Sequence, residues 1–533
     1  MPLTTAPERA REAASRYLSN IVVIDDRMSM GDSGDTHGLN VDELSRAFAQ
    51  VDFSCGVYKP TGQQDEADVI AKLILKSDAA VLDWSLSNGS SASGGEASQT
   101  RDQESVTAKP ELCINAIRKV LEADHLHGKP LRLIIIYTAE TITQTVVDDL
   151  RTALGGSDLR AVAAGEFGLE NDSTKILFKG KAFVGTVPQP FAQGQFALPV
   201  DELPEYITKQ YAGLAAGLMP PAVLHALSAL REGAGELLGI FSSKHDPAMI
   251  LHAMLIPNTD DAAPFLRELL LDELSRIVEG CKGFNDSFSL EIFTEWINKK
   301  PSYASHGAPQ EAHTADKLIT FLTSREEGEG LTDKQAKKLL AVLYGTADWW
   351  KTARGFCRTC TLKYDPWSND RPIGKEFMPV LTLGTIIRNT TGDFLICIVP
   401  RCDAARVVDG QPFPFLTMKR SRLDKDFSLT VKSSIDGNML LAAPNSVSWQ
   451  KLSLIRFSPQ GKEERIKAEC HDGSVILRLK DVRCFIDADG TVYEWVGDLK
   501  PHLALKLATD LAPGLSRVGI DEFDWLRLKK KSN

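Results

Sequence analysis

The sequence has few of the features that mark exported, membrane-spanning or disulfide-stapled proteins. Nine cysteines are spread over 533 residues, a density too low for a disulfide scaffold. No apolar run approaches the roughly 20 residues that a membrane-spanning helix needs. Charged residues also occupy the N-terminal stretch where an export signal would carry its apolar core. These absences predict a reduced, cytoplasmic protein without a membrane segment.

Nucleotide-binding and nucleic-acid-binding signatures are also missing. Neither the phosphate-binding pattern G-x-x-x-x-G-K-[ST] nor a strand-linked G-x-G-x-x-G occurs. The formal net charge of −10 weighs against a nucleic-acid-coating role, because binding phosphates needs a positive face. What is present is an ordinary globular composition, 43% hydrophobic and 25% charged. The length predicts several domains rather than one core.

Apolar runs alternate with amphipathic segments over the first 180 residues. The segments between the runs carry apolar residues at helical spacing. Strands that read as continuous apolar runs, separated by helices, indicate a parallel sheet covered on both faces. We therefore expect an α/β fold of the flavodoxin-like, doubly wound kind with a five-stranded sheet. The predicted strands are 21–25, 53–58, 79–84, 131–139 and 174–179.

Changes in composition and in hydrophobic periodicity along the chain predict three domains. Residues 1–200 form the α/β domain, and serine and glycine dominate 85–109, which predicts a long mobile loop after the third strand. Residues 201–375 have helical patterns and predict an all-helical domain or connector, in which Pro220 and Pro221 separate or kink two helices. Residues 376–533 predict a β-rich domain that ends in a helix.

Acidic residues end the first and third predicted strands. Asp25 and Asp26 are adjacent, and two like charges about 4 Å apart at a surface-like dielectric repel by roughly 4 kcal/mol. Either they point apart and cap the next helix, or something positive lies between them. Because open α/β sheets bind ligands at the carboxyl ends of their strands, Asp83, Thr138 and Lys179 should share this edge.

A magnesium ion would relieve the repulsion between Asp25 and Asp26. A carboxylate pair with one further oxygen suits Mg²⁺, which would also screen the charge of an incoming phosphoryl group. We expect Asp25, Asp26 and Asp83 to hold the metal. The helix-cap interpretation of the acidic pair stays open, and Lys179 competes with Lys181 in the sequence FKGKAF.

This ordered set resembles the receiver domain of two-component response regulators, over roughly residues 18–190. The resemblance implies that Asp25 and Asp26 bind Mg²⁺ and that Asp83 accepts a phosphoryl group from a partner histidine kinase. It also implies that the backbone carbonyl of Ser85 completes the metal shell.

The resemblance assigns roles to two further residues and shows departures. Thr138 would donate a hydrogen bond to a phosphoryl oxygen, and Lys179 would pair with the phosphoryl charge. Lys179 is followed by Gly180, where the family usually has proline. Ile176 stands where many receivers carry an aromatic switch residue, although Phe178 is near, so the usual threonine–aromatic switch is in doubt.

Four cysteines, two in the predicted helical region and two in the predicted β-rich region, are a second candidate metal site. Cys357 and Cys360 have metal-ligand spacing, and with Cys397 and Cys402 they could hold a structural zinc. Cys397 lies in an apolar strand pattern, however, where cysteine is usually a core residue. Zinc binding and a purely structural role both stay open.

The sequence supports three hypotheses about function. The first is a signalling protein of a bacterial phosphorelay, phosphorylated on Asp83 and acting as a regulator or phosphate sink; such divergent receivers are similar to components of anti-phage phosphorelays of the Detocs type. The second is a pseudo-receiver that serves as a scaffold without phosphorylation. The third is an effector enzyme within 376–533. A phosphodonor protein is the expected partner, and a homodimer is left open.

Overall fold

The structure is a computed structural model, and several stretches of the chain lie outside the residues that it describes. Most of the predicted loop 85–109, most of the helical pattern in 333–350, and Cys402 are among them. The described residues are 6–29, 39–86, 110–127, 130–155, 158–163, 165–182, 197–255, 262–299, 315–323, 343, 349–368, 373–374, 376–401, 403–420, 429–433, 437–442, 452–459, 464–471 and 482–516.

The chain divides into two compact units. The first comprises 1–303 with 313–330, and the second comprises 304–312 with 331–533. The division into three domains at 200 and 375 stays a prediction. Among the described residues, no helix is both long enough and apolar enough to cross a membrane.

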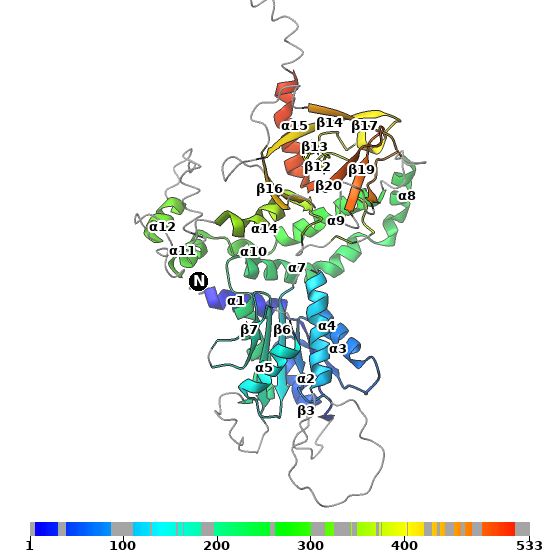
Figure 1. Cartoon of the computed structure of the whole chain (residues 1–533). Coiled ribbons are helices and arrows are strands. Elements are labelled where there is room, and N and C mark those ends of the chain that lie inside the picture. The colour runs from blue at the N-terminus through cyan, green and yellow to red at the C-terminus, as the bar shows by residue number, and fades with distance from the viewer. Residues whose placement is uncertain are drawn as a thin grey trace, which may run out of the picture. The chain divides into compact units, whose positions relative to one another are not determined.

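A parallel sheet forms the centre of the first unit (Figure 1). Five parallel strands follow the order β4-β1-β5-β6-β9, which confirms the flavodoxin-like, doubly wound prediction. In β5 and β6 the side chains on both faces of the sheet are buried, as the continuous apolar runs of their sequences predict. The bounds are β1 Asn20–Ile24, β4 Ser54–Tyr58, β5 Ala79–Leu82, β6 Arg132–Thr138 and β9 Thr174–Lys181.

Short strands that the sequence did not predict extend the sheet beyond β9. Strand β8 pairs antiparallel with β9 and β7 pairs with β8, while β10 runs parallel to the end of β9. The free edge of β9 is therefore covered along most of its length. The bounds are β7 Arg160–Ala161, β8 Gly168–Glu170 and β10 Ala197–Leu198; a separate small pair is β2 Met28–Ser29 with β3 Leu39–Asn40.

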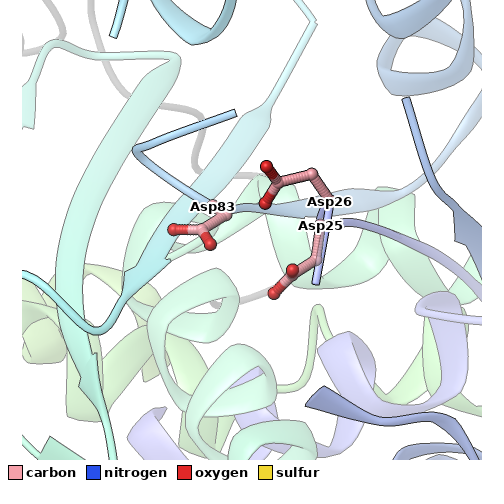
Figure 2. A group of neighbouring side chains, drawn as sticks. All are labelled: Asp25, Asp26 and Asp83. Carbon is pink, nitrogen blue, oxygen red and sulfur yellow. The ribbon is translucent and has the colours of Figure 1, made fainter. Parts of the chain in front are cut away.

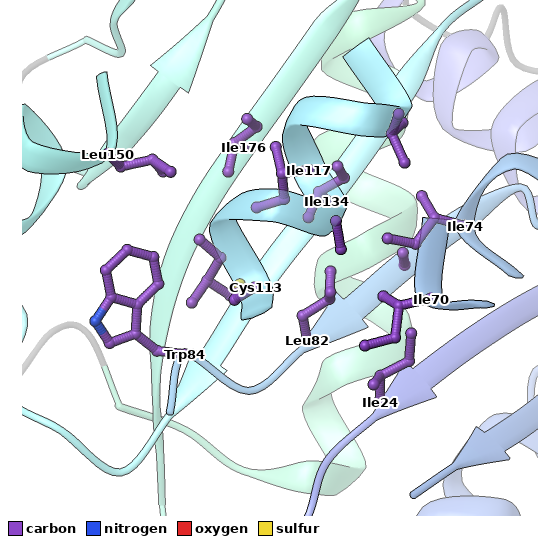
Figure 3. Packing of buried hydrophobic residues seen from close by; sticks show 14 of the residues in the cluster. Ile24, Ile70, Ile74, Leu82, Trp84, Cys113, Ile117, Ile134, Leu150 and Ile176 are labelled. Carbon is purple, nitrogen blue, oxygen red and sulfur yellow. The ribbon is translucent and has the colours of Figure 1, made fainter. Parts of the chain in front are cut away.

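Helices cover both faces of this sheet. One face packs against α3, α4 and α5, and Figure 3 shows Ile134 of the sheet and Ile117 of α4 among the fully buried side chains of this layer. The other face packs against α1, α2 and α6. Each buried apolar side chain of this size contributes roughly 1.5–3 kcal/mol to folding. The bounds are α1 Ala6–Tyr17, α2 Val41–Ala49, α3 Glu66–Lys76, α4 Glu111–His127, α5 Gln144–Ala153 and α6 Leu203–Leu214.

Helix α6 and the long helix α7 belong to the same packing unit as the sheet. Tyr211 of α6 is buried with the sheet residues Ile135 and Tyr137, although α6 follows the predicted α/β region. Arg231 of α7 binds Asp78, with its Nη2 3.0 Å from Oδ1. These contacts attach the start of the helical region firmly to the sheet.

The remaining helices of the first unit follow in sequence. Pro220 and Pro221 lie in the first turn of α7, so they mark the start of a second helix, as predicted. The bounds are η1 Val200–Glu202, α7 Met219–Ile240, η2 Ser243–His245, α8 Asp246–Leu255, α9 Ala262–Glu279, α10 Lys282–Asp286, α11 Leu290–Lys299 and α12 Ala315–Thr323.

The second unit is β-rich and ends in a helix, as predicted. Its 10-stranded sheet has the order β15-β16-β14-β13-β12-β20-β19-β18, with β11 paired to β20 and β17 to β14. The bounds are α14 Trp349–Thr361, β11 Leu362–Tyr364, β12 Thr385–Arg388, β13 Phe394–Cys397, η4 Asp403–Ala405, β14 Gln411–Arg420, β15 Leu429–Ser433, β16 Gly437–Ala442, β17 Leu452–Phe457, β18 Glu469–His471, β19 Val482–Ile486, β20 Val492–Leu499 and α15 Pro501–Ser516.

A buried carboxyl group lies in the centre of that second sheet. Asp498 of β20 pairs with Thr385 of β12, and its Oδ1 accepts a hydrogen bond from Trp495 Nε1 at 3.5 Å. Burial raises the pKa of Asp498 to about 6. The folded state therefore holds the carboxyl proton of Asp498 more tightly than the unfolded chain does, because in the unfolded chain the pKa is near 4.

This pKa predicts how the second unit responds to pH. Because the folded pKa is the higher one, stability is lost as pH rises through about 6. Asp498→Asn, which carries no charge to bury, should raise the free energy of unfolding at pH 7.5 by up to about 3 kcal/mol and change it little at pH 4. Calorimetry at both pH values measures this, and an equal effect at the two would contradict the prediction.

Candidate functional site

The parallel register brings two strand ends together at one edge of the first sheet. Ile24, the last residue of β1, pairs with Leu82, the last residue of β5. Asp25 and Asp83 follow directly, so both carboxylates leave neighbouring strands at the same level. Asp25 is 2% exposed and Asp83 is 6% exposed. The edge thus holds two charged groups that are almost completely removed from water.

Asp26 completes a group of three carboxylates. Figure 2 shows Asp25, Asp26 and Asp83 together at this edge, and one ligand oxygen from each lies within 4.8 Å of the others. A hydrogen bond from the backbone N–H of Arg27 to Asp25 Oδ1, at 2.7 Å, fixes the turn after β1. The acidic pair at the strand end is therefore part of a cluster with the carboxylate from β5.

A lysine ammonium group lies between two of these carboxylates. Lys181 Nζ is 2.6 Å from Asp25 Oδ2 and 2.8 Å from Asp83 Oδ2, and its side chain is 2% exposed. Burial raises the pKa of Asp25, and the lysine charge opposes that effect. Burial lowers the pKa of Lys181, but the charges of Asp83 and Asp25 outweigh it and leave the pKa above its usual value. This lysine supplies positive charge between Asp25 and Asp83, rather than between the adjacent residues Asp25 and Asp26.

The structure corrects the expectation that Lys179 shares this site. Lys179 Nζ lies over the ring of Tyr206 of α6, 4.7 Å from its centroid. Strand β9 continues to Lys181, so Lys179 lies two residues, about 7 Å, back from the edge on the same face of the sheet. The alternation of a strand places both lysines on that face. Only the position of the strand end decides which one meets the carboxylates.

Thr138 ends β6, and Glu140 and Ser85 lie in the loops that follow β6 and β5. Thr138 is the last residue of β6 and is 2% exposed, and its Oγ1 accepts a hydrogen bond from the Glu140 N–H at 3.2 Å. The hydroxyl of Ser85 donates a hydrogen bond to Glu140 Oε1. This contact joins the two loops beside Asp83. The sequence reasoning did not single out Glu140.

The donor set of the cluster fits a hard divalent cation. Mg²⁺ prefers oxygen ligands and commonly uses one or two carboxylates with several waters. Asp83 Oδ2 is bound to Lys181, whereas Asp83 Oδ1 is buried and has no hydrogen-bond partner in the part of the chain that the structure describes. A buried carboxylate oxygen normally has a partner, so this atom is suited to a bound ligand or to chemistry.

The described cysteines of the second unit do not form such a group. Cys357 and Cys360 lie on α14, and Cys397 is a fully buried core residue of β13. Within the described part of the chain, the metal-ligand side chains that gather in a group of three or more are Asp25, Asp26 and Asp83. Zinc binding that involves Cys402 concerns a residue outside that part.

A doubly wound sheet with an acidic edge and a lysine from its last parallel strand defines a receiver-type α/β domain. Residues 9–184 match the family model of the response receiver domain. No curated protein and no solved structure matches the chain. The receiver domain supports a response-regulator-like signalling role and implies a phosphodonor partner in general.

The lysine at the site also changes the comparison with other receivers. The expected aromatic position lies three residues before the site lysine. Counted from Lys181 it is Phe178, whereas counted from Lys179 it is Ile176. Phe178 is 1% exposed and packs edge-on against Trp84, with ring centroids 5.3 Å apart. The aromatic position is therefore filled, and it contacts the residue that directly follows Asp83.

Removal of the bridging lysine should destabilise the first unit. Lys181→Met leaves Asp25 and Asp83 buried without their cation, and breaking a buried ion pair in this way typically costs about 3–5 kcal/mol of unfolding free energy. The loss should shrink as pH falls from 7.5 to 5, because the pKa of Asp25 is raised and protonation removes the repulsion. Denaturant unfolding at both pH values measures this.

Lys179→Met is the matched control, because it removes a buried lysine from the same strand and leaves the carboxylates paired. Its loss of stability should not depend on the protonation of Asp25. Equal pH dependence in the two variants would contradict the assignment of Lys181 to the site.

Proposed function

We propose that the first unit accepts a phosphoryl group on Asp83 from a phosphohistidine of a partner histidine kinase, in the presence of Mg²⁺. The observation that carries the proposal is Asp83 Oδ1, which is buried, has no hydrogen-bond partner among the described residues and lies beside two further carboxylates and Lys181. A carboxylate oxygen without a hydrogen bond keeps its lone pairs available for attack on phosphorus. Lys181 is positioned to balance the charge that accumulates.

The transfer is a single displacement at phosphorus. Asp83 Oδ1 attacks the phosphoryl group, the new P–O bond forms as the P–N bond breaks, and the departing imidazole takes up a proton. Asp25, Asp26 and Asp83 would hold Mg²⁺, which supplies charge neutralisation for the phosphoryl oxygens. Lys181 pairs with the acyl phosphate, and the Thr138 hydroxyl at the end of β6 is placed to donate to a phosphoryl oxygen.

The role of the phosphorylated protein belongs to the same proposal. Phosphorylation adds negative charge at one edge of the sheet, next to Trp84 and Phe178. A shift of these two packed rings would transmit the change from the site into the core. A regulator or phosphate-sink role, including one in an anti-phage phosphorelay, rests on the resemblance of the receiver domain to such components.

A second function is favoured by one specific observation. Lys181 already offsets part of the charge of Asp25 and Asp83 through two short contacts that need no metal. A pseudo-receiver that binds partner proteins and is never phosphorylated would have the same arrangement. The response to a phosphodonor separates the two functions.

Intact-mass spectrometry should show one phosphoryl adduct after incubation with Mg²⁺ and a small phosphodonor such as phosphoramidate. The adduct should require Mg²⁺ and disappear in Asp83→Asn, which lacks the nucleophilic carboxylate. Asp172→Asn, an exposed aspartate of the same unit, is the matched control and should still be labelled.

Two results would count against phosphorylation of Asp83. An adduct that persists in Asp83→Asn would place the modification elsewhere. Failure of labelling together with failure to bind beryllofluoride, which mimics a phosphoryl group, would favour the pseudo-receiver.

A further inference from the structure

A groove lies between α1, α6 and the end of α11 in the first unit. Its volume is about 540 Å³, within the range of roughly 300–1,000 Å³ that small-molecule sites have. None of the residues that line it belongs to the carboxylate cluster at the sheet edge. This α1–α6 groove is therefore a second place on the first unit where a ligand could bind.

The floor of the α1–α6 groove carries almost no side chains. Ala10 of α1 and Ala212 of α6 line it and are buried, and Gly213, Ala216 and Gly217 continue it past the end of α6. A β-carbon added at Gly213 would have no atom within 4 Å beyond the adjacent chain, so the space above it is open. Alanine and glycine leave a smooth apolar surface, which suits an unbranched hydrocarbon chain.

Basic residues predominate among the charged residues of the groove. Arg11, Lys209 and Lys299 line it, with Glu8 as the one acidic residue among its lining. Arg11 and Lys299 each have a glutamate partner, whereas Lys209 is exposed and forms no ion pair with another described residue. In a chain whose formal net charge is −10, this local excess of positive charge favours an anionic ligand.

We propose that the α1–α6 groove binds a medium-chain fatty acid. The hydrocarbon chain lies on the alanine and glycine floor, and the carboxylate pairs with the Lys209 ammonium. A partner helix fits less well, because helix-in-groove recognition uses anchors spaced over two turns, and α6 ends at Leu214, before Ala216 and Gly217. Binding at this site does not require phosphorylation of Asp83.

Isothermal titration calorimetry of the full chain with decanoate tests the site. Decanoate should bind once per chain, with a dissociation constant on the order of 0.1 mM for a ligand of this size. Gly213→Leu should weaken binding at least about tenfold, because the new side chain occupies the groove. Leucine also favours a helix more than glycine does, so the melting temperature of this variant should not fall.

Gly235→Leu is the matched control for the added side chain. Gly235 lies on α7, and a β-carbon there also meets no atom within 4 Å. This variant should bind decanoate like the wild type, because Gly235 does not line the groove.

Lys209→Gln tests the contact with the carboxylate. It should weaken decanoate binding about threefold at low salt and less at high salt, because an exposed charge pair is weak and screened. Binding of decanol, which has the same hydrocarbon chain and no charge, should stay unchanged in this variant. Lys72→Gln, at an exposed lysine of α3, controls for net charge and should leave both ligands unaffected.

Several results would overturn the inference. Absence of decanoate binding to the wild type, or equal binding to Gly213→Leu, would refute the site. Equal losses for decanoate and decanol in Lys209→Gln would refute the carboxylate contact. Binding that appears only after deletion of residues 1–5 would assign the groove to the N-terminus of the chain itself. Cosedimentation with anionic phospholipid vesicles that Gly213→Leu abolishes would assign the groove to a membrane lipid instead.

Discussion

The arrangement of the first unit depends on one ammonium group held between two carboxylates. Lys181 joins the carboxyl ends of β9, β1 and β5 at a point where water is almost excluded. Without that cation the edge would carry buried like charges, and the strands would have to separate or take up protons. With it, the three strand ends stay together, and one oxygen of Asp83 is left without a hydrogen bond to any described residue. The stability of this edge and the proposed reactivity of Asp83 thus depend on the same ion pairs.

Much of the first unit could be predicted because its pattern is local. Continuous apolar runs such as that of β6 report a strand buried on both faces, and the carboxyl ends of parallel strands lie at one edge whatever the loops contain. That argument placed Asp25 and Asp83 together. It could not choose between Lys179 and Lys181, because both face the same side and the choice depends on where β9 ends.

Other features had no local signal. Strands β7, β8 and β10 have only two or three residues, too few for any period to register, and they exist because β9 offers an edge to pair with. Glu140 resembles any loop glutamate until the fold brings it to Ser85. In the second unit, the β-rich character and the final helix could be predicted from the pattern of residues 376–533. The order of its strands depends on pairings between distant segments, which the sequence pattern does not encode.

The packing of α6 has a consequence for how the molecule can be divided. The family match stops at residue 184, before β10 and α6 begin. Yet Ile207 and Tyr211 of α6 fill one face of the sheet, and the Tyr137 hydroxyl donates a hydrogen bond to the Leu198 carbonyl at 2.6 Å. A fragment truncated at the family boundary would expose this face to solvent and invite aggregation. A portion that is cut out and keeps this core closed must therefore extend through α6 and into α7, whose Leu224 belongs to the same core.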